Sequence, residues 1–300
     1  HCKARLVTDR YARKGIFPLI DLTLRLREFR QTSLLFVVKG ENPQELYQST
    51  TAMSDSLSNF LGSLEKAQYT STSQSVFSDT LEFIKSYYDD GKEPVTGVVE
   101  RVKTQPQEEL INKSISGGKD EYKLVCEGLA VFKEDMLLGY LDGLQARSYN
   151  LIINEFGNAF IEIPMDGGKI IVETKNSKSD IKADFIDGIP TFHINIDVEN
   201  TVINQQSKKD INIDKEMKKL ENSFNKILET QISETIKTVQ KEYNSDIFGF
   251  GRELHIQKPE VWKKIGKQWY NYFDKSKITV TVHSTITRQG ALNKPAMLKQ

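Results

Sequence analysis

The sequence predicts a multi-domain α+β protein in which mixed and antiparallel sheets are covered by helices. Short apolar runs rich in β-branched residues alternate with amphipathic stretches in the first part of the chain. Four β-rich runs follow one another from residue 160, and one stretch of helical periodicity extends from Ile213 to Tyr243. A chain of 300 residues with 38% hydrophobic content can bury more than one core. Because the long amphipathic helix lies between β-rich runs, we expect it to pack on a sheet in a C-terminal domain.

Residues 1–118 are expected to belong to an N-terminal domain of alternating strands and helices. Asn42 precedes Pro43, a favourable helix start because proline needs no backbone donor at the first helical position. The apolar face of a later helix is predicted at Phe77, Leu81, Ile84 and Tyr88. In chain order, the other predicted elements are a strand at 5–8, a helix at 18–26, and strands at 32–38 and 95–102.

Two further domains are expected, a small middle domain at 119–165 and a C-terminal α+β domain at 166–300. In the middle domain, two strands joined by a short hairpin connection precede a helix. The later strands are read as an antiparallel meander, and Gly249 and Gly251 as a turn that ends the long helix. The predicted elements are strands at 122–132, 136–141, 160–164, 170–175, 181–185, 191–199 and 277–287, with helices at 142–153, 213–243 and 259–272.

The overall charge balance argues against nucleic acid as a partner. Lys plus Arg and Asp plus Glu number 41 each, so no net field draws the chain to phosphate. The sequence also has no apolar run near the roughly 20 residues that a membrane-spanning helix needs.

Cysteine and histidine usage predicts no metal site and no cofactor. Cys2 and Cys126 are too few for a disulfide framework or an ordinary metal site, and no role is assigned to either. Lone imidazoles in strands, as at His193 and His283, are read as structural. The four histidines lie far apart in sequence, at His1, His193, His255 and His283.

No catalytic residue is predicted. Gly249-Phe250-Gly251 follows a helix and lacks the Lys-Ser/Thr of a phosphate loop. The carboxylate pairs Asp89-Asp90 and Glu108-Glu109 lie in polar connections, where solvated charge is the simplest interpretation. No Gly-x-Ser-x-Gly motif is present, and neither cysteine has a neighbouring histidine in an interpretable motif.

Two charged regions have alternative interpretations. The lysines between Lys208 and Lys219 are interleaved with acidic residues, which is typical of a solvated helix face. Arginines concentrate at 9–13 and 25–30. Salt bridges explain them most simply, and contact with a partner or a lipid headgroup is the alternative.

Several segments resemble the C subunits of spore nutrient germinant receptors, the Ger(x)C lipoprotein family. The most recognisable is Gly128 to Asp135 followed by Leu138-Gly139-Tyr140-Leu141. The other segments are 7–16 with 22–30, 246–251, 255–263 and 280–290.

The resemblance implies a three-domain, non-enzymatic lipoprotein on the outer face of the spore inner membrane. There it would work with polytopic A and B receptor subunits in sensing nutrients. It also implies that a signal peptide, a lipid-modified cysteine and the start of the first domain precede this sequence, and Cys2 does not resemble the lipid-modified position. The family has no known catalytic residues to carry over.

Two other functions remain open at this point. The first is direct binding of a small-molecule germinant in a crevice between domains. The second is a lipid- or wall-directed hydrolase whose nucleophile and base, or metal ligands, come together only on folding.

Overall fold

The computed structural model describes residues 3–26, 30–40, 46, 61, 72–103, 122–165, 167–206 and 214–288. They divide into two compact units. The first unit draws on 1–67, 74–146 and 245–252, and the second on 68–73, 147–244 and 253–300. Each unit contains a sheet with helices, which confirms the predicted α+β class. The domain boundaries near residues 118 and 165 stay predictions.

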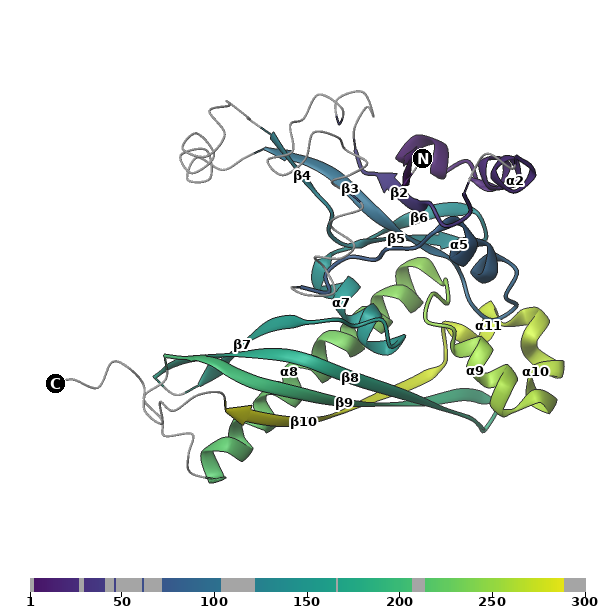
Figure 1. Cartoon of the computed structure of the whole chain (residues 1–300). Coiled ribbons are helices and arrows are strands. Elements are labelled where there is room, and N and C mark those ends of the chain that lie inside the picture. Colours follow the sequence, from purple (N-terminus) through teal and green to yellow (C-terminus); the bar gives the residue numbers. More distant parts are fainter. Residues whose placement is uncertain are drawn as a thin grey trace. The chain divides into compact units, whose positions relative to one another are not determined.

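The first unit is built on a six-stranded mixed sheet (Figure 1). β1, β2 and β3 are parallel neighbours, and β5 and β6 continue the sheet in antiparallel pairing. β4 pairs only with the last four residues of β3. The strands are β1 (Ala4–Thr8), β2 (Leu34–Val38), β3 (Val95–Lys103), β4 (Tyr122–Val125), β5 (Leu129–Lys133) and β6 (Met136–Leu141).

Strand β2 is buried on both faces, as its unbroken apolar sequence requires. Leu35 and Val37 join a core cluster that includes Ile16, Ile20 and Phe83. The alternate residues of β2 join a second cluster, because successive side chains of a strand point to opposite faces. Both faces of this sheet therefore have their own core.

The helices of the first unit begin at clear caps. Thr8 caps α1 (Asp9–Ala12) by accepting from Tyr11 N, and the Asp135 carboxylate accepts from the first residue of α2 (Phe17–Arg25) at 2.9 Å. Asp79 and Glu82 form a reciprocal capping box on α5 (Thr80–Tyr87). α7 (Gly143–Ile152) follows β6, and its residues from Arg147 onward belong to the second unit.

The predicted apolar face of α5 was wrong in two respects. Phe77 precedes the helix, because Asp79 caps it, and Tyr88 is exposed. The buried aromatic residue is Phe83, whose ring meets Phe132 edge-on at 5.2 Å between centroids. The helix that was expected to begin near Pro43 lies outside the described residues.

The stretch from Tyr122 to Phe132 forms two strands where one was predicted. Gly128 has a φ of +83°, which L side chains rarely adopt, and a side chain there would meet the carbonyl of Leu141. The chain therefore turns at 126–128 between β4 and β5. The hairpin between β5 and β6 is confirmed, with Glu134 at positive φ in its two-residue turn.

The second unit contains a four-stranded sheet in the order β10-β9-β8-β7 (Figure 1). The predicted antiparallel meander of β7 (Ala159–Met165), β8 (Gly168–Ile186) and β9 (Ile189–Gln205) is confirmed. The strands predicted at 170–175 and 181–185 form one continuous strand, however, because a register shift between Thr174 and Asn176 keeps the polar residues between them paired with β9. β10 (Lys277–Arg288) pairs in parallel with β9.

The predicted long helix lies along one face of this sheet (Figure 1). It runs as α8 (Asp214–Thr238) and ends in a π-helical turn at Val239–Tyr243, followed by Asn244 in the left-handed conformation. Its buried stripe recurs every four residues, as the packing of one helix face on a sheet requires. The stripe is Leu220, Phe224, Leu228, Ile232 and Ile236.

Two glutamates of α8 also cover the edge of the sheet. Glu229 accepts from the backbone N–H of Val282 at 3.0 Å, and Glu221 accepts from that of Ile286 at 3.2 Å. β10 is an edge strand, whose free N–H groups would otherwise be available to another chain.

Short helices replace the single helix that was predicted from Pro259 to Tyr272. α10 (Pro259–Ile265), a 3₁₀ turn (Gly266–Gln268) and α11 (Tyr270–Phe273) follow one another. They are preceded by α9 (Phe250–Gln257), so Gly249 and Gly251 lie where a helix starts. The prediction of a helix-ending turn there was wrong, because the Asp246 side chain caps the new helix.

Candidate functional site

Asp246 is a fully buried carboxylate that organises the segment 245–252 within the first unit. It accepts from the backbone N–H groups of Gly249, Phe250 and Gly251 at 2.9, 3.1 and 2.7 Å. Its own carbonyl accepts from Glu93 N at 2.8 Å. Three donors compensate the buried charge, so this carboxylate has a structural role.

A partly exposed polar cluster surrounds Asp9. Arg13 Nε lies 2.8 Å from one carboxylate oxygen, and the Tyr140 hydroxyl donates to the other at 2.5 Å. Burial acts to raise the pKa of Asp9, but the hydrogen bonds from Arg13 and Tyr140 outweigh it and hold that pKa below its ordinary value. The pKa of Tyr140 is raised, first by burial and then by the hydrogen bond to Asp9.

Tyr140 also forms a wall of a trough of about 720 Å³ in the first unit. Lys39 Nζ lies 5.7 Å from the centre of this ring and 3.1 Å from Glu100 Oε2. At the other end, Asp142 and Gln145 cap α7 by exchanging hydrogen bonds with each other's backbone N–H groups. The trough has polar and apolar walls and a volume typical of small-molecule sites.

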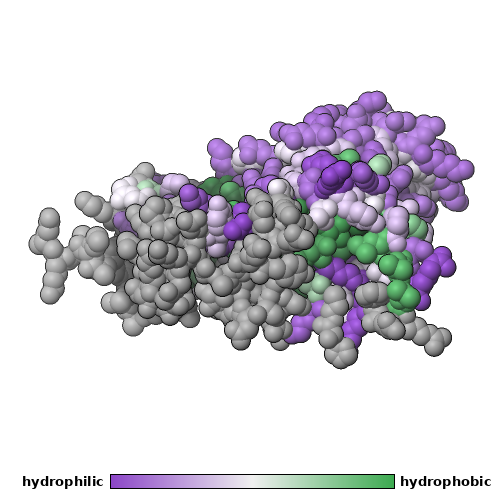
Figure 2. Space-filling view, turned by 90° about the horizontal axis from the view of Figure 1, so that it is seen from above, coloured by the Kyte–Doolittle hydropathy of each residue, from purple (hydrophilic) through white to green (hydrophobic). Residues whose placement is uncertain are grey.

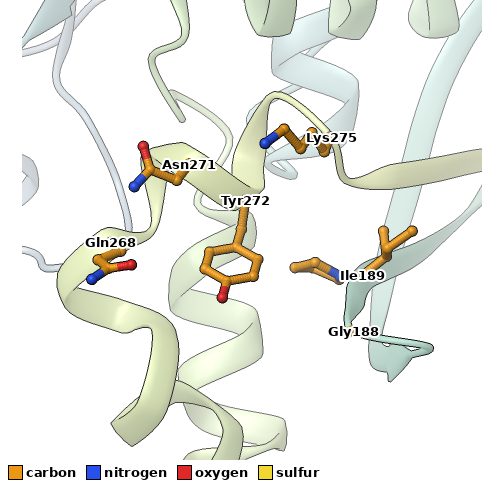
Figure 3. A pocket seen from close by; sticks show the side chains of 7 residues that line it. Gly188, Ile189, Gln268, Asn271, Tyr272 and Lys275 are labelled. Carbon is orange, nitrogen blue, oxygen red and sulfur yellow. The ribbon is translucent and has the colours of Figure 1, made fainter.

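A smaller hollow of about 260 Å³ lies in the second unit (Figure 3). The ring of Tyr272 stands in its middle, with Gln268 and Asn271 to one side and Ile189 to the other. The hollow exists because the β8–β9 turn, in which Asp187 and Gly188 both have positive φ, ends beside α11. Amide, hydroxyl and ammonium groups around an aromatic ring can hold a small polar molecule.

Cys126 is the described cysteine, and its thiol is a poor nucleophile. Burial raises its pKa to about 12, against a smaller opposing effect of Ser75. The thiolate is the reactive form, so at neutral pH this side chain stays protonated. Its backbone carbonyl accepts from the Ser75 hydroxyl at 2.5 Å.

The histidines within the described residues take part in side-chain packing or face outward. His193 and His283 are exposed on strands, and His193 Nδ1 lies 2.6 Å from Thr279 Oγ1. The His255 ring stacks on Trp262 at 5.4 Å between centroids. Across the described ranges, no three His, Cys, Asp or Glu side chains gather as metal ligands would.

The other residues singled out in the sequence either form ion pairs or lie outside the described residues. Asp89, which was read as solvated charge, lies 3.7 Å from Arg252. Arg13 and Arg25 pair with acidic residues four positions earlier, as the salt-bridge interpretation predicted. His1, Cys2, Glu108-Glu109 and Lys208-Lys209 lie outside the described residues. The sequence reading missed Asp246, although an aspartate three residues before Gly249 is the usual spacing of a helix cap.

Comparison with known families decides the identity of the chain. The family described as "Spore germination B3/GerAC like, C-terminal" matches residues 127–290, and the "Spore germination protein N-terminal domain" matches residues 1–101. The chain belongs to the spore germination B3/GerAC-like family. This confirms the resemblance to the Ger(x)C proteins that the sequence segments indicated.

Relatives of this family in Bacillus subtilis (strain 168) differ in how much they share with the chain. Spore germination protein B3 is 24% identical over 180 residues, which are 59% of this chain and 47% of that protein. The chain thus spans about half the length of this relative in the alignment. Putative spore germination protein YfkR is 21% identical over 297 residues, which are 98% of this chain and 73% of that protein.

A solved structure supports the same fold. The structure titled "Crystal Structure of the GerBC protein" superposes with a TM-score of 0.69 at 19% identity, and the match covers 95% of this chain and 79% of that one. Family membership associates the chain with spore germination and with the spore. Among the described helices, none combines the length and apolar character that crossing a membrane requires.

Proposed function

We propose that the chain is a non-catalytic lipoprotein subunit of a nutrient germinant receptor. It is held by an N-terminal lipid anchor on the outer face of the spore inner membrane and assembles there with the A and B membrane subunits. The observation that carries the proposal is that two germination family models match the chain, at residues 1–101 and 127–290.

The chemistry of the described polar groups supports a structural rather than a catalytic role. Asp246 is saturated by backbone donors, Asp9 is held by Arg13 and Tyr140, and the Cys126 thiol is protonated at neutral pH. The two carboxylates are occupied in holding the fold and the thiol is unreactive, which suits an assembly subunit.

A membrane tether would make modest affinity for partner subunits sufficient. Confinement to one membrane raises the effective concentration of the subunit near its partners, so that individually weak contacts hold the complex together. Cross-linking in spore membranes tests this directly. The full-length protein, immunoprecipitated after cross-linking, should bring down the A and B subunits, and recovery without them would contradict the proposal.

Direct binding of a small-molecule germinant is the second candidate, and the trough in the first unit favours it. Its volume of about 720 Å³ suits a small polar ligand, and Lys39, Glu100 and Tyr140 offer both charges and an aromatic wall. Calorimetric titration with individual nutrients tests this candidate, using Glu100→Gln as the variant and Glu162→Gln, on β7, as the control. The expectation from sequence that such a site lies in a crevice between domains stays a prediction.

A further inference from the structure

The N-terminal helices combine exposed apolar side chains with an excess of positive charge. Eleven large hydrophobic residues are exposed within the described chain, and four of them lie between residues 11 and 26. They are Tyr11 (42% exposed), Leu22 (49%), Leu24 (39%) and Leu26 (41%). We call these four residues the α2 surface.

The four side chains of the α2 surface lie outside the core clusters of the described part of the first unit. Ile20 and Thr23 point inward and are buried, and the exposed leucines flank them, with Leu22 and Leu26 on one side of the helix and Leu24 on the other. The start of α2 is fixed independently, because Asp135 accepts from the backbone N–H groups of Ile16 and Phe17. Figure 2 shows that the face of the molecule seen from above carries an apolar area next to hydrophilic residues.

The segment that carries this surface has an excess of positive charge. The segment 9–30 contains six basic and three acidic residues, a net charge of +3, whereas the whole chain has a net charge of zero. Two of the acidic residues, Asp9 and Asp21, are already paired with arginines. The side chains of Arg10, Lys14 and Arg30 are exposed and have no ion-pair partner among the described residues.

We propose that the α2 surface docks on an anionic lipid membrane. Leucines that enter the headgroup region beside basic side chains that contact lipid phosphates are the combination by which helices bind a membrane surface. The charge excess favours an anionic membrane over a neutral apolar partner, and Tyr11 has an amphipathic ring suited to the interface. This inference deepens the proposed function, because it rests on a membrane location.

Vesicle flotation of the chain, purified in a form without a lipid modification, tests the docking. Vesicles of equal parts phosphatidylglycerol and phosphatidylcholine should float the chain at low ionic strength, whereas pure phosphatidylcholine should not. Each basic residue near an anionic surface contributes about 1 kcal/mol, so Arg10→Gln with Lys14→Gln should weaken binding roughly thirty-fold. Raised salt should weaken binding in the same direction.

Matched variants distinguish specific binding through this surface from nonspecific adsorption to vesicles. Leu22→Ser with Leu26→Ser should abolish flotation while circular dichroism and the thermal midpoint stay near wild type. Phe160→Ser with Ile203→Ser is the control, since these residues are similarly exposed (48% and 46%) in the second unit. Lys264→Gln with Lys267→Gln is the matching control for charge. Both controls should bind like the wild type.

Three outcomes would overturn the docking. In the first, the chain does not float with anionic vesicles. In the second, the leucine variants float as well as the wild type. In the third, the chain binds no vesicles and its leucine variants no longer capture the A or B subunit. The last would make the α2 surface a protein interface. Each leaves the germination role intact, since that role is measured separately in spores.

Discussion

The buried carboxylate of Asp246 makes the sharpest stability prediction. In Asp246→Asn the amide oxygen still accepts from Gly249 and Phe250, but its NH₂ group faces the N–H of Gly251. One charge-assisted hydrogen bond is lost, and one buried donor is left without an acceptor. Such a loss costs about 1–3 kcal/mol, and Asp246→Ala, which also removes the helix cap, should cost about 1 kcal/mol more.

Hydrogen exchange measures this effect where it arises. Peptides covering 245–252 and β5 should exchange faster in Asp246→Asn, because Ser245 donates to the Phe132 carbonyl and Asp246 accepts from Glu93 N. Asp180→Asn, at an exposed position on β8, is the control and should exchange like wild type. Unchanged exchange in the Asp246→Asn peptides would refute the assignment of this carboxylate as the cap that holds the segment in place.

Three further predictions test other parts of the fold. Removing both edge-covering glutamates, in Glu221→Ala with Glu229→Ala, should lower the free energy of unfolding by about 1–3 kcal/mol per side chain and increase aggregation, measured by urea unfolding and light scattering. Phe83→Ala should cost about 3–5 kcal/mol in urea unfolding, whereas Tyr88→Ala should cost far less, because only Phe83 is buried. The pKa of the Cys126 thiol is raised from its ordinary value near 9 to about 12. Alkylation of the native protein should therefore be slow at neutral pH, and the stability contribution of Cys126 should be lost as pH rises from about 9 towards 12, because the unfolded chain releases the proton first.

Periodicity was enough to predict most elements of the fold. The long helix, the β7–β9 meander and the hairpin after β5 follow from local patterns of apolar residues and turn residues. The break at Gly128 could not be predicted in this way, because it depends on the close approach of the Leu141 carbonyl. The continuity of β8 likewise depends on pairing with β9, which overrides the turn preference of Asn176.

The candidate sites were harder to predict from the sequence than the fold. The trough and the hollow gather residues from separate strands and helices, such as Lys39 with Tyr140, and Ile189 with Tyr272. No pattern of residue spacing along the chain predicts that these residues lie close together in the fold. The arginine-rich N-terminal segments were visible in the sequence, but the exposure of the leucines among them became visible only when α2 was placed against its core.

Germination of spores lacking the gene tests the central claim most directly. Deleting the gene should abolish or slow germination with nutrients while leaving germination with a receptor-independent trigger unchanged, and the full-length gene should restore the nutrient response. A version that lacks the cysteine proposed to carry the lipid should restore it poorly. Failure with both triggers would contradict the receptor role and place the protein in a later step of germination.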